Sequence, residues 1–237
     1  MKRKVGMIIS MILFLIGLGI LLFPWLNNEY TTYSMNLAGK RFAENSASRL
    51  LKEEGIEDLK EIDPLFLEMQ KYNQNLVKTG QAGLVDPWSY EQTSIDLTKY
   101  GYKENVIGML KIPKLDIIMP IALGASKENM KSGAAHLSQT SLPIGGESSN
   151  TVIAGHRGYR GAAMFRHLDQ LEIGDKVMVQ NLWEELTYEV VEIKVILPSE
   201  ISDVLIQPGR DLVTLVTCHP YTENYQRYVV YCEREKE

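Results

Sequence analysis

The feature that most limits what this chain can form lies near its N-terminus. Val5–Leu26 contains 22 residues and no charged side chain. At a rise of about 1.5 Å per residue, a helix of this length is roughly 33 Å long and can cross the hydrocarbon core of a bilayer. Trp25 suits the membrane interface, and the basic residues of Met1–Lys4 favour a cytoplasmic N-terminus. The sequence therefore predicts a membrane anchor in residues 1–27 and an extracytoplasmic location for the rest.

A cleaved signal peptide is the alternative explanation of this run. The apolar segment of a signal peptide is usually shorter, and no small-x-small cleavage site follows Pro24-Trp25-Leu26. No second apolar run of spanning length occurs in the sequence. We therefore expect a single-pass protein of the cell membrane with a retained anchor.

The composition excludes some classes of function. The chain has 237 residues, a formal net charge of −5 and 45% hydrophobic residues, whereas a nucleic-acid binder normally shows a basic face. Its four histidines include no i, i+4 pair, and no Cys-x-x-Cys motif occurs. Cys218 and Cys232 are too few for a disulfide framework, and we expect no bond between them. The expectation is one packed domain with no nucleic-acid partner, no cofactor and no metal.

Beyond the anchor, the residue pattern divides the chain into three segments. Residues 28–79 are predicted to form a helical flank, with breakers at Gly55 and Pro64. Residues 80–104 are predicted to form a loop and linker. Residues 105–237 show roughly eight short β patterns separated by turn signals, which predicts a mainly β domain, either a barrel or a sandwich. The expected elements are Val106–Ile112, Asp116–Leu123, Asn150–Gly155, a short helix over Phe165–Leu171, Lys176–Asn181, Leu186–Pro198, Asp211–Thr217 and Arg227–Glu233.

Two side chains with catalytic potential follow apolar strands. Cys218 ends a β-branched strand just before Pro220, so its thiol is expected at the rim of the sheet. A buried structural cysteine is the alternative, because most free cysteines have that role. His156 follows another apolar strand and stands between Gly155 and Arg157-Gly158. A hydrogen-bonded structural histidine explains it equally well on this basis alone.

Arg227 opens the strand that follows the cysteine. If His219–Gln226 is a hairpin connection, Cys218 and Arg227 are neighbours on adjacent strands. A thiolate can act as a nucleophile, and a histidine can carry protons to and from an amine. A guanidinium can stabilise a developing oxyanion with a charge that it does not lose. The three residues therefore predict one site for acyl transfer.

These motifs resemble those of the sortase family. The resemblance rests on Thr214-Leu-Val-Thr-Cys218 with Arg227 downstream, and on Ala154-Gly-His156-Arg-Gly158. It extends to Gly133-Ala-Ala-His-Leu137 and Ser141-Leu-Pro143, and it covers nearly all of the chain from about residue 102. It implies a closed eight-stranded β-barrel with Cys218, His156 and Arg227 as the catalytic triad. It also implies cleavage of a Leu-Pro-x-Thr-Gly sorting signal after Thr, a thioacyl intermediate, and transfer to an amine.

Asp86-Pro87-Trp88 resembles the lid of class C sortases, which polymerise pilins. Carried over by residue, the resemblance pairs Asp86 with Arg227 and lays the Trp88 ring over Cys218. It implies pilin substrates with the sorting signal and a pilin lysine as the amine acceptor. An ordinary turn with a packed tryptophan is the alternative for these three residues.

Other functions remain open at this point. A housekeeping sortase would use the same chemistry to attach surface proteins to peptidoglycan, and the lid argues against it. A plain cysteine protease would release a free acid with no preference for amines. A membrane-tethered barrel that only binds a ligand would lose nothing when Cys218 is replaced by alanine.

Overall fold

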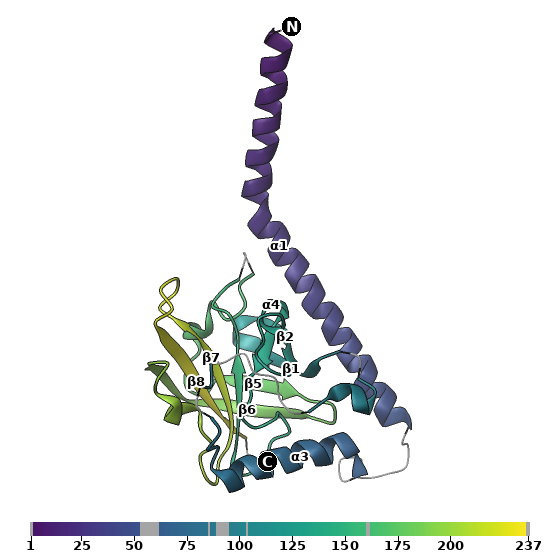
Figure 1. Ribbon diagram of the computed structural model, residues 1–237, viewed down its shortest axis with the longest axis vertical. Helices are drawn as coiled ribbons and strands as arrows, with labels where there is room; N and C mark the ends of the chain where they lie inside the picture. Colours follow the sequence, from purple (N-terminus) through teal and green to yellow (C-terminus); the bar gives the residue numbers. More distant parts are fainter. Residues whose placement is uncertain are drawn as a thin grey trace.

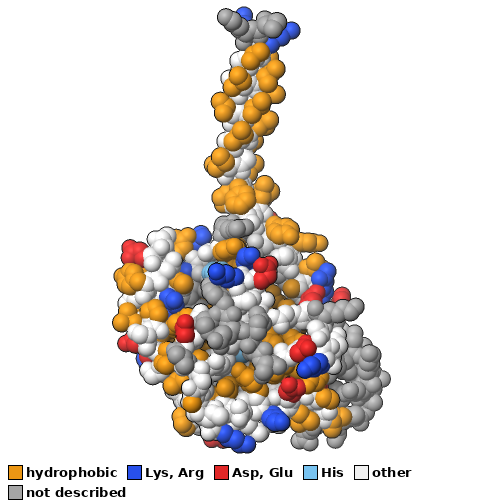
Figure 2. Space-filling view, viewed as in Figure 1, with side chains coloured by type: hydrophobic (Ala, Val, Ile, Leu, Met, Phe, Trp, Pro, Cys, Tyr) orange, Lys and Arg blue, Asp and Glu red, His pale blue; other side chains and the backbone are white. Residues whose placement is uncertain are grey.

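The computed structural model describes residues 2–52, 62–84, 86–88, 95–102, 104–159 and 162–235, without the side chains of residues 2, 45 and 47–52. A long helix, α1 (Lys2–Lys52), leads away from the barrel toward the N-terminus (Figure 1). Among the described residues it is the one helix long and apolar enough to cross a membrane, with a mean hydropathy of 2.8 in its most apolar window. Hydrophobic side chains cover its outer part in Figure 2. The finding agrees with a membrane anchor.

The inner part of α1 packs on the barrel. Met35 and Phe42 are buried there, 8% and 4% exposed respectively. The helix therefore continues without a break across the expected boundary between residues 27 and 28. Because the same helix is fully exposed on one side of this boundary and packed on the other, it joins the apolar segment directly to the domain.

Helix α3 (Pro64–Thr79) lies at the end of the barrel away from the apolar part of α1 (Figure 1). Asp63 caps its N-terminus by accepting a hydrogen bond of 2.8 Å from the Leu65 backbone nitrogen, and Pro64 occupies the first turn, where no donor is needed. Gly80 ends the helix in the left-handed region at φ 58°. The expected breaker at Pro64 thus marks a helix start, while Gly55 lies outside the described residues.

Eight strands of the described chain form a closed barrel in the order β1-β2-β3-β4-β7-β8-β6-β5. Closure decides between the barrel and the sandwich, and the predicted fold class is confirmed. The strands are β1 (Val106–Ile112), β2 (Ile117–Ala122), β3 (Ala134–His136), β4 (Ser149–Ala154), β5 (Lys176–Gln180), β6 (Glu185–Ile196), β7 (Asp211–His219) and β8 (Gln226–Arg234). The short helix η1 (Leu97–Tyr100) precedes β1. The connections between strands contain η2 (Pro113–Leu115), α4 (Asn129–Ser132), η3 (Leu168–Gln170) and η4 (Ile201–Val204).

Two elements differ from the pattern-based expectation. Strand β3 has only three residues, all buried, so it shows no alternation in the sequence. The helix expected over Phe165–Leu171 is a 3-10 turn, η3. Phe165, Leu168 and Leu171 are all buried, and their spacing of three fits a 3-10 turn, in which i and i+3 lie on one face.

The pairing of β4, β7 and β8 brings their ends together. β4 and β7 are parallel, with Ala154 beside Val216, so both strands end at the same rim of the barrel. β8 returns antiparallel to β7 and therefore starts at that rim. The largest fully buried side chains of the described residues are Tyr188, Tyr231, Phe165, Leu65, Met69, Ile107, Leu110, Ile112, Ile121, Leu142, Ile153 and Leu168.

Candidate active site

A small cavity of about 100 Å³ lies at this rim. Cys218, His156 and Arg227 all line it, so the structure brings together the three residues that the sequence predicted to meet. Its full lining is Trp88, Ala125, Met130, Leu137, Ala154, Gly155, His156, Val216, Thr217, Cys218 and Arg227. A thiol, an imidazole and a guanidinium around one cavity can supply a nucleophile, a proton carrier and an oxyanion donor.

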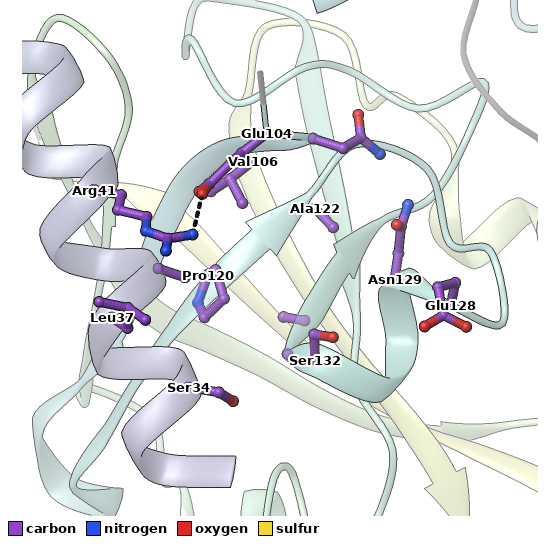
Figure 3. Close-up of a pocket in the computed structure, with 14 residues that line it drawn as sticks. Ser34, Leu37, Arg41, Glu104, Val106, Pro120, Ala122, Glu128, Asn129 and Ser132 are labelled. Carbon is purple, nitrogen blue, oxygen red and sulfur yellow. Dashed lines mark hydrogen bonds and ion pairs between the residues drawn. The ribbon is translucent and has the colours of Figure 1, made fainter. Parts of the chain in front are cut away.

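Two larger hollows lie between α1 and the barrel, with volumes of about 410 and 430 Å³. Figure 3 shows the first, where α1 faces β2 and α4 and Arg41 forms an ion pair of 2.7 Å with Glu104. Neither hollow has a cysteine or histidine among its described lining residues. The smaller cavity is therefore the candidate active site.

Cys218 stands directly opposite Arg227 in the ladder between β7 and β8. The residues before it, Leu212–Thr217, are all buried, and Cys218 itself is half-buried. Strand β7 runs two residues further than expected, to His219. The predicted adjacency of Cys218 and Arg227 across two strands is confirmed.

His156 follows the end of β4, and the backbone that carries it is bound to β7. The Gly155 nitrogen donates to the Val216 carbonyl at 3.1 Å, and the Thr217 hydroxyl donates to the Gly155 carbonyl at 2.8 Å. A Cβ at Gly155 would lie 2.6 Å from the Phe165 ring, so only glycine fits this close approach. These contacts fix the start of the His156 segment against the strand that carries Cys218.

The imidazole of His156 is partly buried and stacks on the Tyr159 ring, with centroids 5.0 Å apart and planes at 15°. Burial lowers the pKa of His156 below its usual range, because the charged form is disfavoured away from water. The ring is therefore neutral at neutral pH before substrate binds. In that state one of its nitrogens can accept a proton.

Arg227 lies against the Trp88 ring, with its Cζ atom 5.1 Å from the ring centroid. Its Nη1 atom donates to the carbonyls of Asn224 at 3.1 Å and Gln226 at 2.9 Å. No carboxylate of the described residues forms an ion pair with it. The guanidinium thus keeps donors for an additional oxygen at the cavity.

The contact expected between Asp86 and Arg227 does not form in the described part of the chain. The Asp86 carboxylate instead accepts a hydrogen bond of 2.9 Å from the Trp88 backbone nitrogen. An aspartate side chain readily accepts a hydrogen bond from the backbone nitrogen two residues ahead, because this local turn fixes only a few rotatable bonds of the chain. The Trp88 indole nitrogen donates to the Pro198 carbonyl at 2.7 Å, and its ring provides the contact with Arg227.

Cys232 and His136 are not among the described residues that line the cavity. Neither cysteine forms a disulfide, and Cys232 is fully buried. Burial raises the pKa of the Cys232 thiol. His136 is fully buried in β3. In the described part of the chain, no group of three or more His, Cys, Asp or Glu side chains is arranged to hold a metal ion.

One cluster beside the cavity was not predicted from the sequence. It consists of Arg157, Asp169, His219 and Tyr228. Its members come from two stretches of the chain, residues 157–169 and 219–228, so no single local pattern indicates it. Arg157 was noted only as part of the motif around His156. The signal in the sequence is a charged residue that follows an apolar strand closely, because an arginine that is buried there needs partners.

Residues 110–235 match the sortase domain model, and the chain therefore belongs to the sortase family of cysteine transpeptidases.

Among curated relatives, Sortase A of Bacillus anthracis is 24% identical over 229 residues, which cover 97% of this chain and 94% of that protein. Sortase D of Bacillus subtilis is 29% identical over 130 residues, 54% of this chain and 63% of that protein.

The solved structures that resemble this chain are mostly class C sortases. Sortase C1 of Streptococcus agalactiae, in complex with MTSET, has a TM-score of 0.70 at 31% identity and covers 83% of this chain and 97% of its own. Sortase C-1 of Streptococcus pneumoniae has a TM-score of 0.66 at 33% identity, over 82% of this chain and 99% of its own. One further neighbour is described as a pilus-related sortase C of Group B Streptococcus, with a TM-score of 0.64 at 33% identity.

Proposed function

We propose that this sortase cleaves a Leu-Pro-x-Thr-Gly type sorting signal after Thr and transfers the acyl group to an amine. The observation that carries the proposal is the arrangement of Cys218, His156 and Arg227 around one cavity at the rim of the barrel. Neutral His156 takes the proton of the Cys218 thiol, and the resulting thiolate attacks the Thr carbonyl carbon. The Arg227 guanidinium stabilises the negative charge that develops on the oxygen. The C–N bond then breaks, and His156 in its protonated form gives a proton to the departing glycine amine.

The second half of the reaction reverses these roles. An incoming amine attacks the thioester carbon, and neutral His156 takes a proton from it. The thiolate of Cys218 leaves, and the new amide bond forms. The lowered pKa of His156 supports its part in this half, because the neutral ring is the form that accepts the proton.

We propose that Asp86, Pro87 and Trp88 form a lid over the cavity. Pro87 is buried, Trp88 lines the cavity, and its indole is anchored to the Pro198 carbonyl. A substrate that places an oxygen on Arg227 has to displace the Trp88 ring from the guanidinium. The lid thus guards the thiol until substrate arrives.

The acceptor we propose is a lysine of a pilin subunit, which makes the product an isopeptide-linked pilus. The class C structural neighbours support this choice, and one of them is described as pilus-related. Attachment of surface proteins to a peptidoglycan amine is the second candidate, favoured by the similarity to a Sortase A over nearly the full length of both chains.

The proposed location is the outer side of the cell membrane. Residues 1–27 supply the cytoplasmic tip and the anchor, residues 28–79 the flank, 80–104 the lid loop and linker, and 105–237 the catalytic barrel. The turn between β7 and β8, beside the cavity, lies at the end of the barrel nearer the apolar part of α1 (Figure 1). In this proposal the site lies at the end of the barrel that is nearer the membrane.

A competition experiment tests this function. The enzyme receives a Leu-Pro-x-Thr-Gly peptide together with equal concentrations of a lysine-bearing pilin fragment and a peptidoglycan-type amine, and products are identified by mass spectrometry. The proposal predicts cleavage between Thr and Gly and a dominant lysine-linked product. A dominant peptidoglycan-type product would support the second candidate, and free acid alone would contradict transpeptidation by this chain.

A further inference from the structure

A second set of side chains lies directly behind the proposed catalytic residues. Arg157, His219 and Tyr228 each follow one of them in the chain, after His156, Cys218 and Arg227, and here they are described together as the backing cluster, with Asp169. Successive side chains of a strand point to opposite faces. Because Cys218 and Arg227 face the cavity, His219 and Tyr228 face away from it.

Arg157 is the centre of the backing cluster. Its Nη1 atom donates to Nδ1 of His219 at 2.5 Å and lies 3.5 Å from the Cys218 carbonyl oxygen. Its Nη2 atom forms an ion pair of 2.5 Å with Asp169 of η3. Its Cζ atom stands 5.8 Å from the centroid of the Tyr228 ring. One guanidinium therefore contacts the residue after Cys218 and the residue after Arg227, and its own backbone follows His156.

The burial of Arg157 is unusual for a charged group beside an open rim. Its side chain is 7% exposed, whereas that of Asp169 is 45% exposed, and its Nε atom is buried with no partner among the described residues. A buried ion pair is weak evidence for stability, since desolvation offsets much of the attraction. The fixed fork of a guanidinium does, however, hold several partners in one geometry, which a lysine cannot do.

We propose that Arg157 is a positioning residue that sets the distances between His156, Cys218 and Arg227. The inference rests on the proposed function, because it concerns the proton transfer and oxyanion contact of that reaction. Arg157 holds the chain after β4, the end of β7 and the start of β8 through one rigid group. A displacement of about 1 Å between reacting groups can lower a rate by about 100-fold.

The test uses Arg157→Lys, which keeps the positive charge and removes the fork. We expect kcat for the sorting peptide to fall by about 10- to 100-fold with KM within about twofold of wild type. Arg210→Lys is the matched control, because Arg210 is also partly buried and forms an ion pair of 2.8 Å with Glu233 at the far end of the ladder between β7 and β8. It should leave both constants unchanged, and the urea midpoint of each variant shows whether it is folded.

A second readout separates this proposal from the proposed function. The alkylation rate of Cys218 at one fixed pH needs no substrate, and the fully buried Cys232 does not contribute. If wild-type enzyme alkylates but forms no transpeptidation product, the proposed function fails, and a changed alkylation rate in Arg157→Lys still supports positioning. A folded Arg157→Lys enzyme with wild-type kcat, KM and alkylation rate would overturn it.

Asp169→Asn provides the test if Arg157→Lys does not fold. The carboxamide has the same shape as the carboxylate, and the position is exposed enough to tolerate it. We expect a severalfold lower kcat at unchanged KM, because the Arg157 fork loses one of its anchors. Wild-type kinetics in this variant would also overturn the proposal.

Discussion

Arg227 combines a charge that cannot be lost with a geometry set by its neighbours. Two backbone carbonyls and the Trp88 ring orient its guanidinium, and Cys218 is its partner on the adjacent strand. A lysine would keep the charge at this position. It would not keep the planar fork, so the proposed contact with a developing oxyanion would lose its fixed direction.

Replacement of Arg227 by lysine should therefore lower kcat by about 100- to 1,000-fold, as loss of an oxyanion donor does in other enzymes. The measurement is the initial rate of peptide cleavage at saturating substrate. The urea midpoint should stay close to that of wild type, because the side chain is not part of the core. A rate within threefold of wild type would exclude Arg227 from the chemistry.

The stability of the fold depends on pH through His136, because protonation of this residue is coupled to unfolding. It is fully buried, and its Nε2 atom donates to the carbonyls of Thr140 at 3.1 Å and Ser141 at 3.0 Å. Burial lowers the pKa of His136 to about 4, although the two carbonyls act in the opposite direction. The unfolded chain, with a pKa near 6.5, therefore takes up a proton before the folded chain does.

The free energy of unfolding should accordingly fall as the pH drops from about 6.5 toward 4, and it should be independent of this residue above that range. The expected loss between pH 7.5 and 4.5 is on the order of 2 to 3 kcal/mol. His136→Gln should remove this part of the loss, while His156 and His219 act equally in both proteins. Parallel urea melts at the two pH values measure it, and identical pH dependence in variant and wild type would contradict the account.

At the scale of elements, the described part of the proposed lid loop contains a local turn at Asp86 and no ion pair between Asp86 and Arg227. The Asp86 carboxylate accepts from the Trp88 backbone nitrogen, and the Trp88 ring contacts Arg227. An asparagine side chain also offers an oxygen to a backbone nitrogen two residues ahead. A role of Asp86 in the turn and a role in an ion pair with Arg227 therefore predict opposite results when Asp86 is replaced by an uncharged residue.

Asp86→Asn should label Cys218 with a thiol reagent at about the wild-type rate, whereas Asp86→Ala and Trp88→Ala should label it severalfold faster. The reason is that asparagine keeps the turn and alanine does not. Second-order labelling rates of the three variants and the parent, measured at one pH, give the comparison. Equal acceleration in Asp86→Asn and Asp86→Ala would indicate an ion pair, and no acceleration in Trp88→Ala would contradict the lid.

The same elements show what the sequence could and could not supply. The long apolar strands β4, β7 and β8 are visible as patterns, and the short connection from His219 to Gln226 placed Cys218 beside Arg227. Strand β3 was not predicted from its pattern, because three buried residues carry no period. The Asp86 turn and the backing cluster around Arg157 depend on which groups compete for a partner in three dimensions, and spacing along the chain does not determine that.

At the scale of the whole molecule, α1 has two functions along its length. Its apolar part is exposed, and its inner part buries Met35 and Phe42 against the barrel. Loss of a buried phenylalanine side chain alone typically costs about 3 to 5 kcal/mol. The proposed anchor is therefore separable from the domain, but the flank is not.

Removal of residues 1–27 should give a soluble enzyme with wild-type kcat and urea midpoint, while the full chain fractionates with membranes. Removal of residues 1–52 should lower the free energy of unfolding by at least about 3 kcal/mol, because it strips the α1 contacts from the barrel. Urea melts of both truncations and membrane fractionation of the full chain provide the data. Equal stability of the two truncations would contradict a packing role for α1.

The most direct test of the account is the intact mass of the enzyme after incubation with a Leu-Pro-x-Thr-Gly peptide. We predict an added mass equal to the peptide acyl group up to Thr, located at Cys218 by fragmentation and released by an added amine. Cys218→Ala should show no adduct while keeping the wild-type urea midpoint. An adduct at Cys232, or an unmodified wild-type enzyme that still cleaves the peptide, would contradict the assignment of Cys218 as the nucleophile.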